Sequence, residues 1–191
     1  VAYTGELGWE LQHPMEMSAY LWDRLMEAGA GFGLKPVGAR AQNWLRQEKS
    51  YRAFGTELGR DATPLEAGLD RFVDLSKEFH GKSAMEATGI RSTCVTLLVN
   101  GPEDADPWGR EALYAGERRV GRLTSGGWSQ AFGQSIAMGY VTPDMAAPGM
   151  ELQVKMFDRL WPARIVEDCP YDPENLRIRT DAPGALAQAA E

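Results

Sequence analysis

The sequence predicts an α+β fold in which a partly helical segment precedes a small all-β domain. Before residue 88, apolar residues recur at helical spacing in two long stretches. Past Gly89, short strand-like stretches alternate with clusters of Gly, Pro, Asn and Asp, and no helical spacing intervenes, which is typical of a small barrel or sandwich. The length of 191 residues allows one ample domain or two small ones, and either can bury a core.

The chain is expected to open with a hairpin followed by a helix. Residues 1–12 mix β-forming residues with Gly5 and Gly8, which predicts strand, tight turn and strand. Pro14 suits the first position of a helix that Gly29 ends. The apolar stripe of this helix is Met17, Leu21, Leu25 and Ala28.

A second helix is predicted from Pro36 to Glu48. Its buried stripe is expected to be Val37, Ala41, Trp44 and Leu45. We interpret Trp22, Leu25 and Leu45 as core residues and not as part of a cofactor site.

Shorter elements are expected in the rest of this segment. Residues 50–62 are predicted to be irregular, and Thr63-Pro64-Leu65-Glu66 resembles the start of a helix. Residues 72–75 suggest a short strand, and residues 81–87 a short helix.

The β-rich half divides the chain into three parts. We assign residues 1–88 to the first domain, residues 89–180 to the β domain and the Ala/Gly/Pro-rich residues 181–191 to a flexible tail. The predicted strands are 93–99, 111–114, 119–124, 135–141, 151–156 and 161–166.

Charge and hydropathy exclude two broad classes of protein. The formal net charge is −7, whereas a general nucleic-acid binder carries a basic surface. The longest basic cluster, Arg118-Arg119 with Arg122, is too thin to provide one. No apolar run approaches the roughly 18–20 residues that a membrane-spanning helix needs.

The termini and the cysteines suggest an intracellular piece of a longer chain. The sequence opens with Val1 instead of Met and has no signal-peptide pattern. Cys94 and Cys169 form no disulfide framework, although one bridge is possible. We therefore expect a cytoplasmic location, or a mitochondrial matrix location in a eukaryote.

Several fragments imitate well-known sites without meeting their requirements. Gly29-Ala30-Gly31-Phe32-Gly33 follows a predicted helix, whereas a dinucleotide fingerprint follows a strand. Gly81-Lys82-Ser83 has Ser76 where a phosphate loop needs its first glycine. The Asp104–Gly109 stretch has Ala115 where a calcium loop needs Glu. Gly127-Trp128-Ser129-Gln130-Ala131 lacks one glycine of a nucleophile elbow.

No metal site is expected. The two histidines, His13 and His80, are far apart in the sequence and neither has a neighbouring cysteine. The sequence contains no zinc-ligand spacing.

Six motifs follow one another in a characteristic order. They are Tyr3-Thr4-Gly5-Glu6-Leu7-Gly8-Trp9-Glu10-Leu11, Leu45-Arg46-Gln47-Glu48-Lys49 with Phe54-Gly55-Thr56-Glu57-Leu58, Thr63–Leu69, Phe79-His80-Gly81-Lys82, Val120–Gly126 and Ser135–Val141. This series resembles the aminomethyltransferase family, the T-protein of the glycine cleavage system and its relatives, up to about Arg179. Gln47 and Trp44 depart from the family pattern, which more often has apolar or small residues there.

The resemblance implies the C-terminal part of the aminomethyltransferase folate-binding fold, followed by a small β-barrel domain. Glu48–Arg52 and Tyr171-Asp172-Pro173-Glu174 look more similar to the folate domain of sarcosine and dimethylglycine dehydrogenases. Those relatives are larger flavoproteins. FAD would therefore belong to an upstream domain and not to this segment.

The resemblance also implies a tetrahydrofolate site. Glu6 matches the carboxylate that binds the pterin, and a carboxylate can accept two adjacent N–H donors in a charge-assisted pair. Arg46 matches an arginine that lines the folate site, and Tyr3 and Trp9 could offer flat surface to the ring. From the residues alone, Glu6 could instead be a surface carboxylate, and Arg46 could pair with Glu48 or Glu10. Thr124-Ser125-Gly126 is interpreted as a structural turn and not as a ligand contact.

The family reaction makes or releases methylenetetrahydrofolate from an aminomethyl or iminium adduct. In relatives the acid beside the cationic centre is an aspartate in an earlier segment, so no catalytic residue is assigned to this chain, and the chain alone is expected to show no turnover. Three hypotheses remain open. They are the folate domain of a flavoprotein acting on a methylated amine, a separate aminomethyltransferase that works with a lipoyl carrier protein, and a non-catalytic folate-binding relative.

Overall fold

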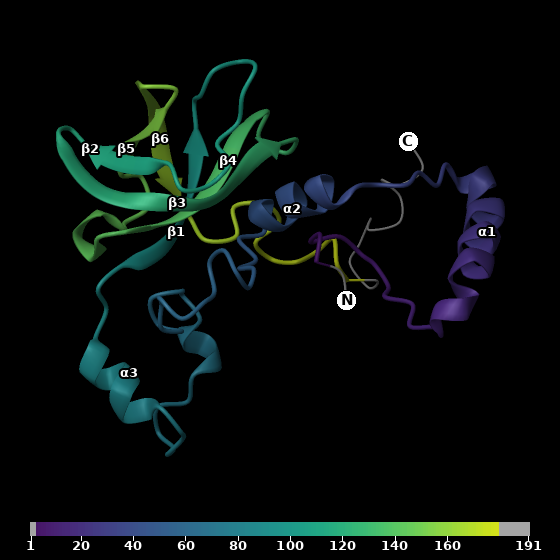
Figure 1. The fold of residues 1–191 in the computed structure, drawn as a ribbon, viewed down its shortest axis with the longest axis horizontal. Coiled ribbons are helices and arrows are strands. Elements are labelled where there is room, and N and C mark those ends of the chain that lie inside the picture. Colours follow the sequence, from purple (N-terminus) through teal and green to yellow (C-terminus); the bar gives the residue numbers. More distant parts are fainter. Residues whose placement is uncertain (1–2, 180–191) are drawn as a thin grey trace.

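A computed structural model describes residues 3–179 of the chain. The predicted tail at residues 181–191 lies outside the described residues. Figure 1 shows a β-barrel at one end of the molecule and helix α1 at the other, with helix α2 and the segment after the last strand between them.

The barrel confirms the predicted β domain. In the described part of the chain, six antiparallel strands close in the order β1-β4-β3-β2-β5-β6. Their bounds are Thr93–Val99 (β1), Ala112–Ala115 (β2), Arg118–Ser129 (β3), Gln134–Val141 (β4), Glu151–Met156 (β5) and Arg159–Val166 (β6). Because every strand has two neighbours, no edge is left to pair with another chain.

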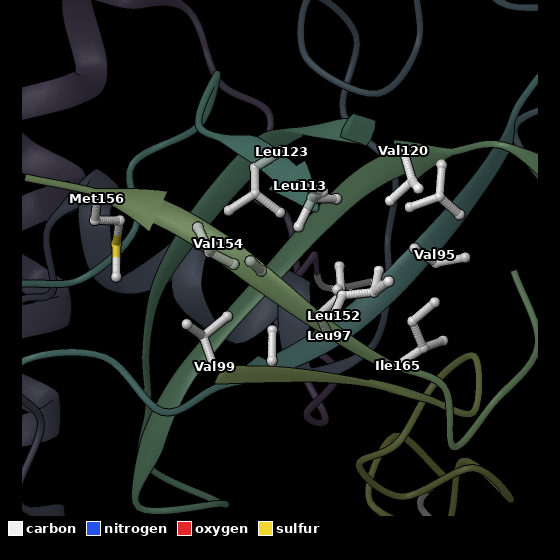
Figure 2. Close-up of a cluster of buried hydrophobic side chains, with 13 residues drawn as sticks. Val95, Leu97, Val99, Leu113, Val120, Leu123, Leu152, Val154, Met156 and Ile165 are labelled. Carbon is white, nitrogen blue, oxygen red and sulfur yellow. The ribbon is translucent and has the colours of Figure 1, made fainter. Parts of the chain in front are cut away.

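The barrel interior is filled by apolar side chains that alternate with outward-facing residues along each strand. In β5, Leu152, Val154 and Met156 are buried, while Glu151 and Lys155 are exposed. Figure 2 shows the inward side chains meeting across the barrel. The cluster includes Val95, Leu97, Val99, Leu113, Val120, Leu123, Ala137, Val141, Leu152, Val154, Met156, Ala163 and Ile165.

The helices lie outside the barrel. They are α1 (Ser18–Gly29), which follows a 3-10 turn at Met15–Met17, α2 (Ala39–Glu48) and α3 (Lys82–Thr88). The predicted helices at 14–29 and 81–87 are therefore confirmed. Helix α2 begins three residues later than expected, because residues 36–38 are extended or irregular.

The predicted buried face of α1 is wrong. Trp22 and Leu25 on α1 are 54% and 43% exposed. Helix α1 lies at the opposite end of the molecule from the barrel (Figure 1), so its apolar stripe does not pack on the barrel. On α2, the predicted residues Ala41, Trp44 and Leu45 are half-buried, and only Val37, which precedes the helix, is exposed, at 76%. On α2 the fully buried residues are the polar Arg46, Gln47 and Glu48.

Three further predictions from the N-terminal half are corrected. Residues 3–12 form turns and irregular structure in place of a hairpin, since no neighbouring strand pairs with them in the described chain. Residues 72–75 continue from a short 3-10 turn, Asp70–Phe72, without strand pairing. The predicted irregular segment at residues 50–62 is confirmed, apart from one isolated bridge between Phe54 and Leu58.

Thr63-Pro64-Leu65-Glu66 forms the hydrogen bonds of a helix cap, but the residues that follow form a turn and not a helix. The Thr63 backbone N–H donates to the Glu66 carboxylate at 2.8 Å, and the Glu66 N–H donates to the Thr63 hydroxyl at 3.2 Å. The turn ends at Gly68, whose φ of +68° leaves the helical region.

Candidate functional site

A run of buried polar residues joins the end of α2 to the barrel. Residues 46–50, Arg-Gln-Glu-Lys-Ser, are each at most 3% exposed, although all five side chains are polar or charged. Burying such groups is unfavourable unless each finds a partner. The contacts that satisfy them define the centre of the site.

Arg46 and Glu57 form a buried ion pair. Arg46 Nη1 donates to Glu57 Oε2 at 2.8 Å and also to the Tyr51 carbonyl oxygen, while Nε donates to Asn43 Oδ1 at 2.9 Å. Neither Glu48 nor Glu10, the partners considered from the sequence, pairs with Arg46. Arg46 Nη2 is buried and has no hydrogen-bond partner among the described residues.

Donors on both sides enclose the Glu57 carboxylate. The hydroxyls of Thr124 and Ser125 donate to Oε1 at 2.7 and 2.6 Å, and the Ala53 N–H and Thr56 hydroxyl donate to Oε2. Burial alone would raise the pKa of Glu57, but the charge of Arg46 and the hydroxyl donors outweigh it and hold that pKa below its ordinary value. Glu57 is therefore a charged anchor between the loop and the barrel.

Thr124 and Ser125 reach Glu57 from within strand β3. The prediction that residues 124–126 form a turn is wrong, because β3 continues through them to Ser129. The pairing register with β4 shifts between Leu123 and Ser125, which marks a β-bulge. The bulge places two adjacent hydroxyls toward the same carboxylate.

Glu48 makes a second attachment of α2 to the barrel. Its Oε1 accepts hydrogen bonds from the Ser129 hydroxyl at 2.5 Å and from the Ala131 N–H at 3.1 Å. The Glu48 carbonyl oxygen accepts from the N–H of Tyr171, in the segment that follows β6. Helix α2 is thereby linked to two separate parts of the C-terminal half.

The segment after β6 also contacts the two residues that follow α2. Lys49 Nζ donates to the Asp172 carbonyl oxygen at 2.5 Å, and the Ser50 hydroxyl accepts from the Cys169 N–H at 2.9 Å. Gly5 lies directly on the Lys49 side chain, where a β-carbon would overlap it. Cys169 and the buried Cys94 are both free thiols, and burial raises the pKa of Cys94 to about 12.

The structure holds Glu6 in position through this C-terminal segment. Glu6 Oε1 accepts a hydrogen bond from the Tyr171 hydroxyl at 2.8 Å, and Arg177 lies 3.7 Å from Oε2. The Glu6 side chain is 39% exposed. Burial, followed by the contact with Glu6, raises the pKa of Tyr171 to about 12, so the Tyr171 hydroxyl remains a donor at neutral pH.

Tyr3 lies close to the buried ion pair, whereas Trp9 does not contact it. The Tyr3 hydroxyl donates to the Arg52 carbonyl oxygen at 2.6 Å, and its ring stacks on Tyr51 with centroids 5.8 Å apart. Desolvation raises the pKa of Tyr3, and the charges of Arg46 and Glu57 also act on it. Trp9 is 75% exposed.

The structure therefore does not bring all four predicted site residues together. Glu6 and Tyr3 share one loop, and Arg46 lies inside the protein behind Tyr51. Sequence reasoning missed Glu57, Ser125 and Tyr171. Glu57 and Ser125 stood inside the ordered motifs, but nothing in the spacing indicated that they would meet.

No metal centre is found among residues 3–179, where no three His, Cys, Asp or Glu side chains are grouped suitably. His13 and His80 are both exposed. In the same part of the chain, no helix has the length and apolar character needed to cross a membrane.

Comparison with known proteins agrees with this architecture. Residues 1–77 match the family model for the GCVT N-terminal domain, and residues 93–172 match that for the glycine cleavage T-protein C-terminal barrel domain. The fold and the ordered motifs thus define a T-protein-type barrel joined to part of a GCVT domain. The chain belongs to the aminomethyltransferase (glycine cleavage T-protein) family.

Curated relatives fall into two groups. Human mitochondrial dimethylglycine dehydrogenase is 40% identical over 191 residues, and the rat protein is 39% identical over 190 residues. The aminomethyltransferase of Thermosynechococcus vestitus is 40% identical over 168 residues, or 86% of this chain. The chain spans 22% of the length of the dehydrogenases and 44% of that aminomethyltransferase.

One solved structure supports the fold. The glycine cleavage system aminomethyltransferase T from Bartonella henselae superimposes with a TM-score of 0.80 over 90% of this chain and 48% of that protein. Its sequence is 24% identical, so the likeness supports the architecture alone.

Proposed function

We propose that this chain supplies the folate-binding part of an enzyme that transfers a one-carbon unit to tetrahydrofolate. The enzyme we favour is a flavoprotein that oxidises a methylated amine of the sarcosine or dimethylglycine type. The similarity to dimethylglycine dehydrogenases over 95–96% of the chain supports this choice. FAD would then belong to another domain of the same protein.

The observation that carries the proposal is the oriented, half-exposed carboxylate of Glu6. A carboxylate has about four acceptor positions. The Tyr171 hydroxyl uses one of them at Oε1, and the Arg177 guanidinium lies 3.7 Å from Oε2. The remaining positions can accept the adjacent N–H donors of a pterin edge as a charge-assisted pair. Tyr171 fixes the direction in which those acceptors point.

The surrounding residues also fit a folate. The Tyr3 ring and the exposed Trp9 ring provide apolar faces on the same N-terminal segment. Arg46 Nη2 is a buried donor that lacks a partner in the described structure, which is the kind of group that a bound ligand satisfies. We assign Glu6 the pterin contact, Tyr3 and Trp9 a contact with a flat ring, and Arg46 a donor role behind them.

When bound, tetrahydrofolate supplies the nucleophilic nitrogen that captures the one-carbon unit. This chain's residues bind and orient it, and they hold the site rigid through the Arg46–Glu57 pair. The acid that stabilises the cationic carbon centre belongs to an earlier segment of the family fold.

Glu6→Gln in the full-length protein tests the proposal. We expect its affinity for 5-formyltetrahydrofolate, measured by isothermal titration calorimetry, to fall about tenfold or more, because an amide cannot accept two N–H donors with charge. Glu10→Gln is the matched control, since Glu10 is exposed on the same segment. Equal affinities of Glu6→Gln and wild type would remove Glu6 from the folate site.

A separate aminomethyltransferase working with a lipoyl carrier protein is the second candidate. The 36–40% identity to bacterial aminomethyltransferases favours it. The visible absorption spectrum of the full-length protein discriminates between the two. A flavin band near 450 nm on a much larger chain supports the dehydrogenase, and a colourless, shorter protein supports the transferase. A full-length protein that binds folate but forms no methylenetetrahydrofolate from a methylated amine or an aminomethyl donor would be the non-catalytic relative.

A further inference from the structure

A cavity of about 940 Å³ lies on the outer surface of the barrel. Residues 55–62 form one wall and residues 108–110 another, and strands β3 and β4 form the floor. None of Tyr3, Glu6, Trp9 and Arg46 lines it. The cavity is therefore separate from the predicted folate-site residues.

A bulge brings two arginines of β3 to the same face. Arg119 and Arg122 are three residues apart, a spacing that would point them to opposite faces of a regular strand. Here Arg122 pairs with Ala112 and Arg119 with Tyr114, because Val120 is the extra residue of a bulge. Ala112 and Tyr114 are two residues apart and share a face, so Arg119 and Arg122 share it as well.

The same face lies beneath the loop at residues 55–62. On its other side, Arg122 pairs with Tyr140 of β4. The Tyr140 hydroxyl donates to the Glu57 carbonyl oxygen at 2.8 Å, which ties this face to the loop. Both arginines are exposed, so their guanidinium groups can be reached from solvent.

A third arginine, Arg110, is held in an unusual backbone conformation at the rim. Its φ is +79°, a left-handed value that is uncommon for residues other than glycine. The Glu111 carboxylate accepts from the N–H groups of Trp108 and Gly109 at 2.9 and 2.7 Å, and the Arg110 N–H donates to the Leu123 carbonyl oxygen. The loop is thus fixed by several contacts that maintain the strained residue, and such residues concentrate at functional sites.

These three guanidinium groups lack protein counterions. Within residues 3–179, no carboxylate lies within 4 Å of the side chain of Arg110, Arg119 or Arg122. Glu57 also lines the cavity, but Arg46 and the hydroxyl donors already engage its carboxylate. Asp61 is the other acid in the lining, which leaves an excess of positive charge in a chain whose net charge is −7.

We propose that this cavity binds a small polyanion that carries two or more carboxylate or phosphate groups. Arginine presents a planar fork of donors that matches both groups, and three such forks, two on the floor and one on a wall, can engage separate anionic centres. The size of the cavity suits a small molecule. The site is independent of the proposed folate contact at Glu6.

The test uses citrate and tripolyphosphate as separate probes. Each is titrated calorimetrically into the full-length protein at low ionic strength, where charge-based binding is strongest. Binding of citrate alone indicates a polycarboxylate ligand, and binding of tripolyphosphate alone indicates a phosphorylated one. We expect Arg119→Gln and Arg122→Gln each to weaken binding roughly tenfold. Arg159→Gln, at an exposed arginine that does not line the cavity, serves as the control.

Arg110→Gly separates binding from folding. Glycine adopts a positive φ without strain, so this variant is expected to unfold at a higher temperature than wild type and still to bind the probe more weakly. The proposal is overturned if neither probe binds at millimolar concentration, or if Arg159→Gln weakens binding as much as Arg122→Gln. Binding of an acidic polypeptide without binding of either small anion would also overturn it.

Discussion

Glu57 lies between the loop after α2 and strand β3, and donors from both elements surround its carboxylate. A buried ion pair stabilises a fold little more than apolar residues of similar volume would. Removing one partner, however, leaves the other charge buried without a counterion and is strongly destabilising. Arg46 is 1% exposed and has no other carboxylate within reach. Replacing one member of the Arg46–Glu57 pair is therefore expected to destabilise the protein more than replacing both.

Glu57→Gln should destabilise the protein by about 3 kcal/mol or more, because it leaves the Arg46 charge buried without a counterion. Urea unfolding at neutral pH measures the free energy of unfolding. Glu103→Gln, at an exposed acid, is the control and should change it by less than about 0.5 kcal/mol. An equally small effect of Glu57→Gln would show that the pair is dispensable.

Glu66 makes stability depend on pH in the acid range. Its hydrogen bonds from Arg91, with those from the Thr63 and Arg91 N–H groups, lower its pKa from 4.5 to about 2. A carboxyl whose pKa is lower in the folded state stabilises the fold above its unfolded value, and that contribution is lost as pH falls from about 4.5 toward 2. We expect the Glu66→Gln variant to show a shallower loss of unfolding free energy than wild type over this window in urea titrations. A slope identical to that of wild type would exclude Glu66 as a cause.

At the residue scale, the sequence indicated which motifs matter but not how their side chains connect. Glu6 was selected from its motif, and the structure shows its contacts with Tyr171 and Arg177, which are 165 or more positions away in the chain. Arg46 is predicted to line the folate site, with Glu48 or Glu10 as alternative partners, and the structure pairs it with Glu57 instead of either acid. Both pairings depend on how segments distant in the chain pack together, and a local sequence pattern does not predict such packing.

Among the secondary-structure elements, helix α2 packs closely on strand β3, where the Trp44 side chain of α2 lies over Gly127 of β3. A β-carbon at Gly127 would overlap the indole of Trp44. The close approach of the helix to the strand therefore depends on this glycine.

Gly127→Ala should destabilise the protein by about 1–3 kcal/mol, since the added methyl group pushes the Trp44 ring away from β3. The free energy of unfolding in urea checks this. Gly59→Ala, where the space around the new methyl group is open, is the control. Repeating Gly127→Ala in a Trp44→Leu background should reduce its cost, and an unreduced cost would contradict the proposed overlap.

Whether a segment forms a helix or a strand is easier to predict from this sequence than which of its faces is buried. The strands were anticipated closely because short apolar stretches between Gly- and Pro-rich turns are a local signal. The bulges in β3 were not anticipated, although they bring Thr124 and Ser125 to Glu57 and Arg119 together with Arg122. A bulge depends on pairing with a partner strand, which the sequence of one strand does not reveal.

At the scale of the whole molecule, α1 and its flanking residues present an uncovered apolar surface. Tyr20, Trp22, Leu25 and Phe32 are 43–92% exposed, whereas the barrel interior is fully packed. The chain also spans only part of the relatives it resembles. The barrel thus has a complete core, while the N-terminal half of the chain does not.

We therefore predict that the 191-residue chain alone forms no methylenetetrahydrofolate, because the acid expected beside the reacting carbon belongs to an earlier segment. The assay incubates the purified chain with tetrahydrofolate and a methylated amine or an aminomethyl donor, and measures product by chromatography. The full-length protein under the same conditions is the control. Product formation by the isolated chain above background would contradict the prediction.

Local sequence features are sufficient to predict the β domain, the family and the approximate positions of helices α1 and α3. These follow from periodicity, turn residues and ordered motifs, all of which are local in the chain. Three features follow from tertiary packing instead. They are the burial of the polar end of α2, the pairing of Glu57 with Arg46 and the hydrogen bond from Tyr171 to Glu6. Buried polar groups are tolerated only where distant segments supply their hydrogen bonds, and that supply exists only once the chain has folded.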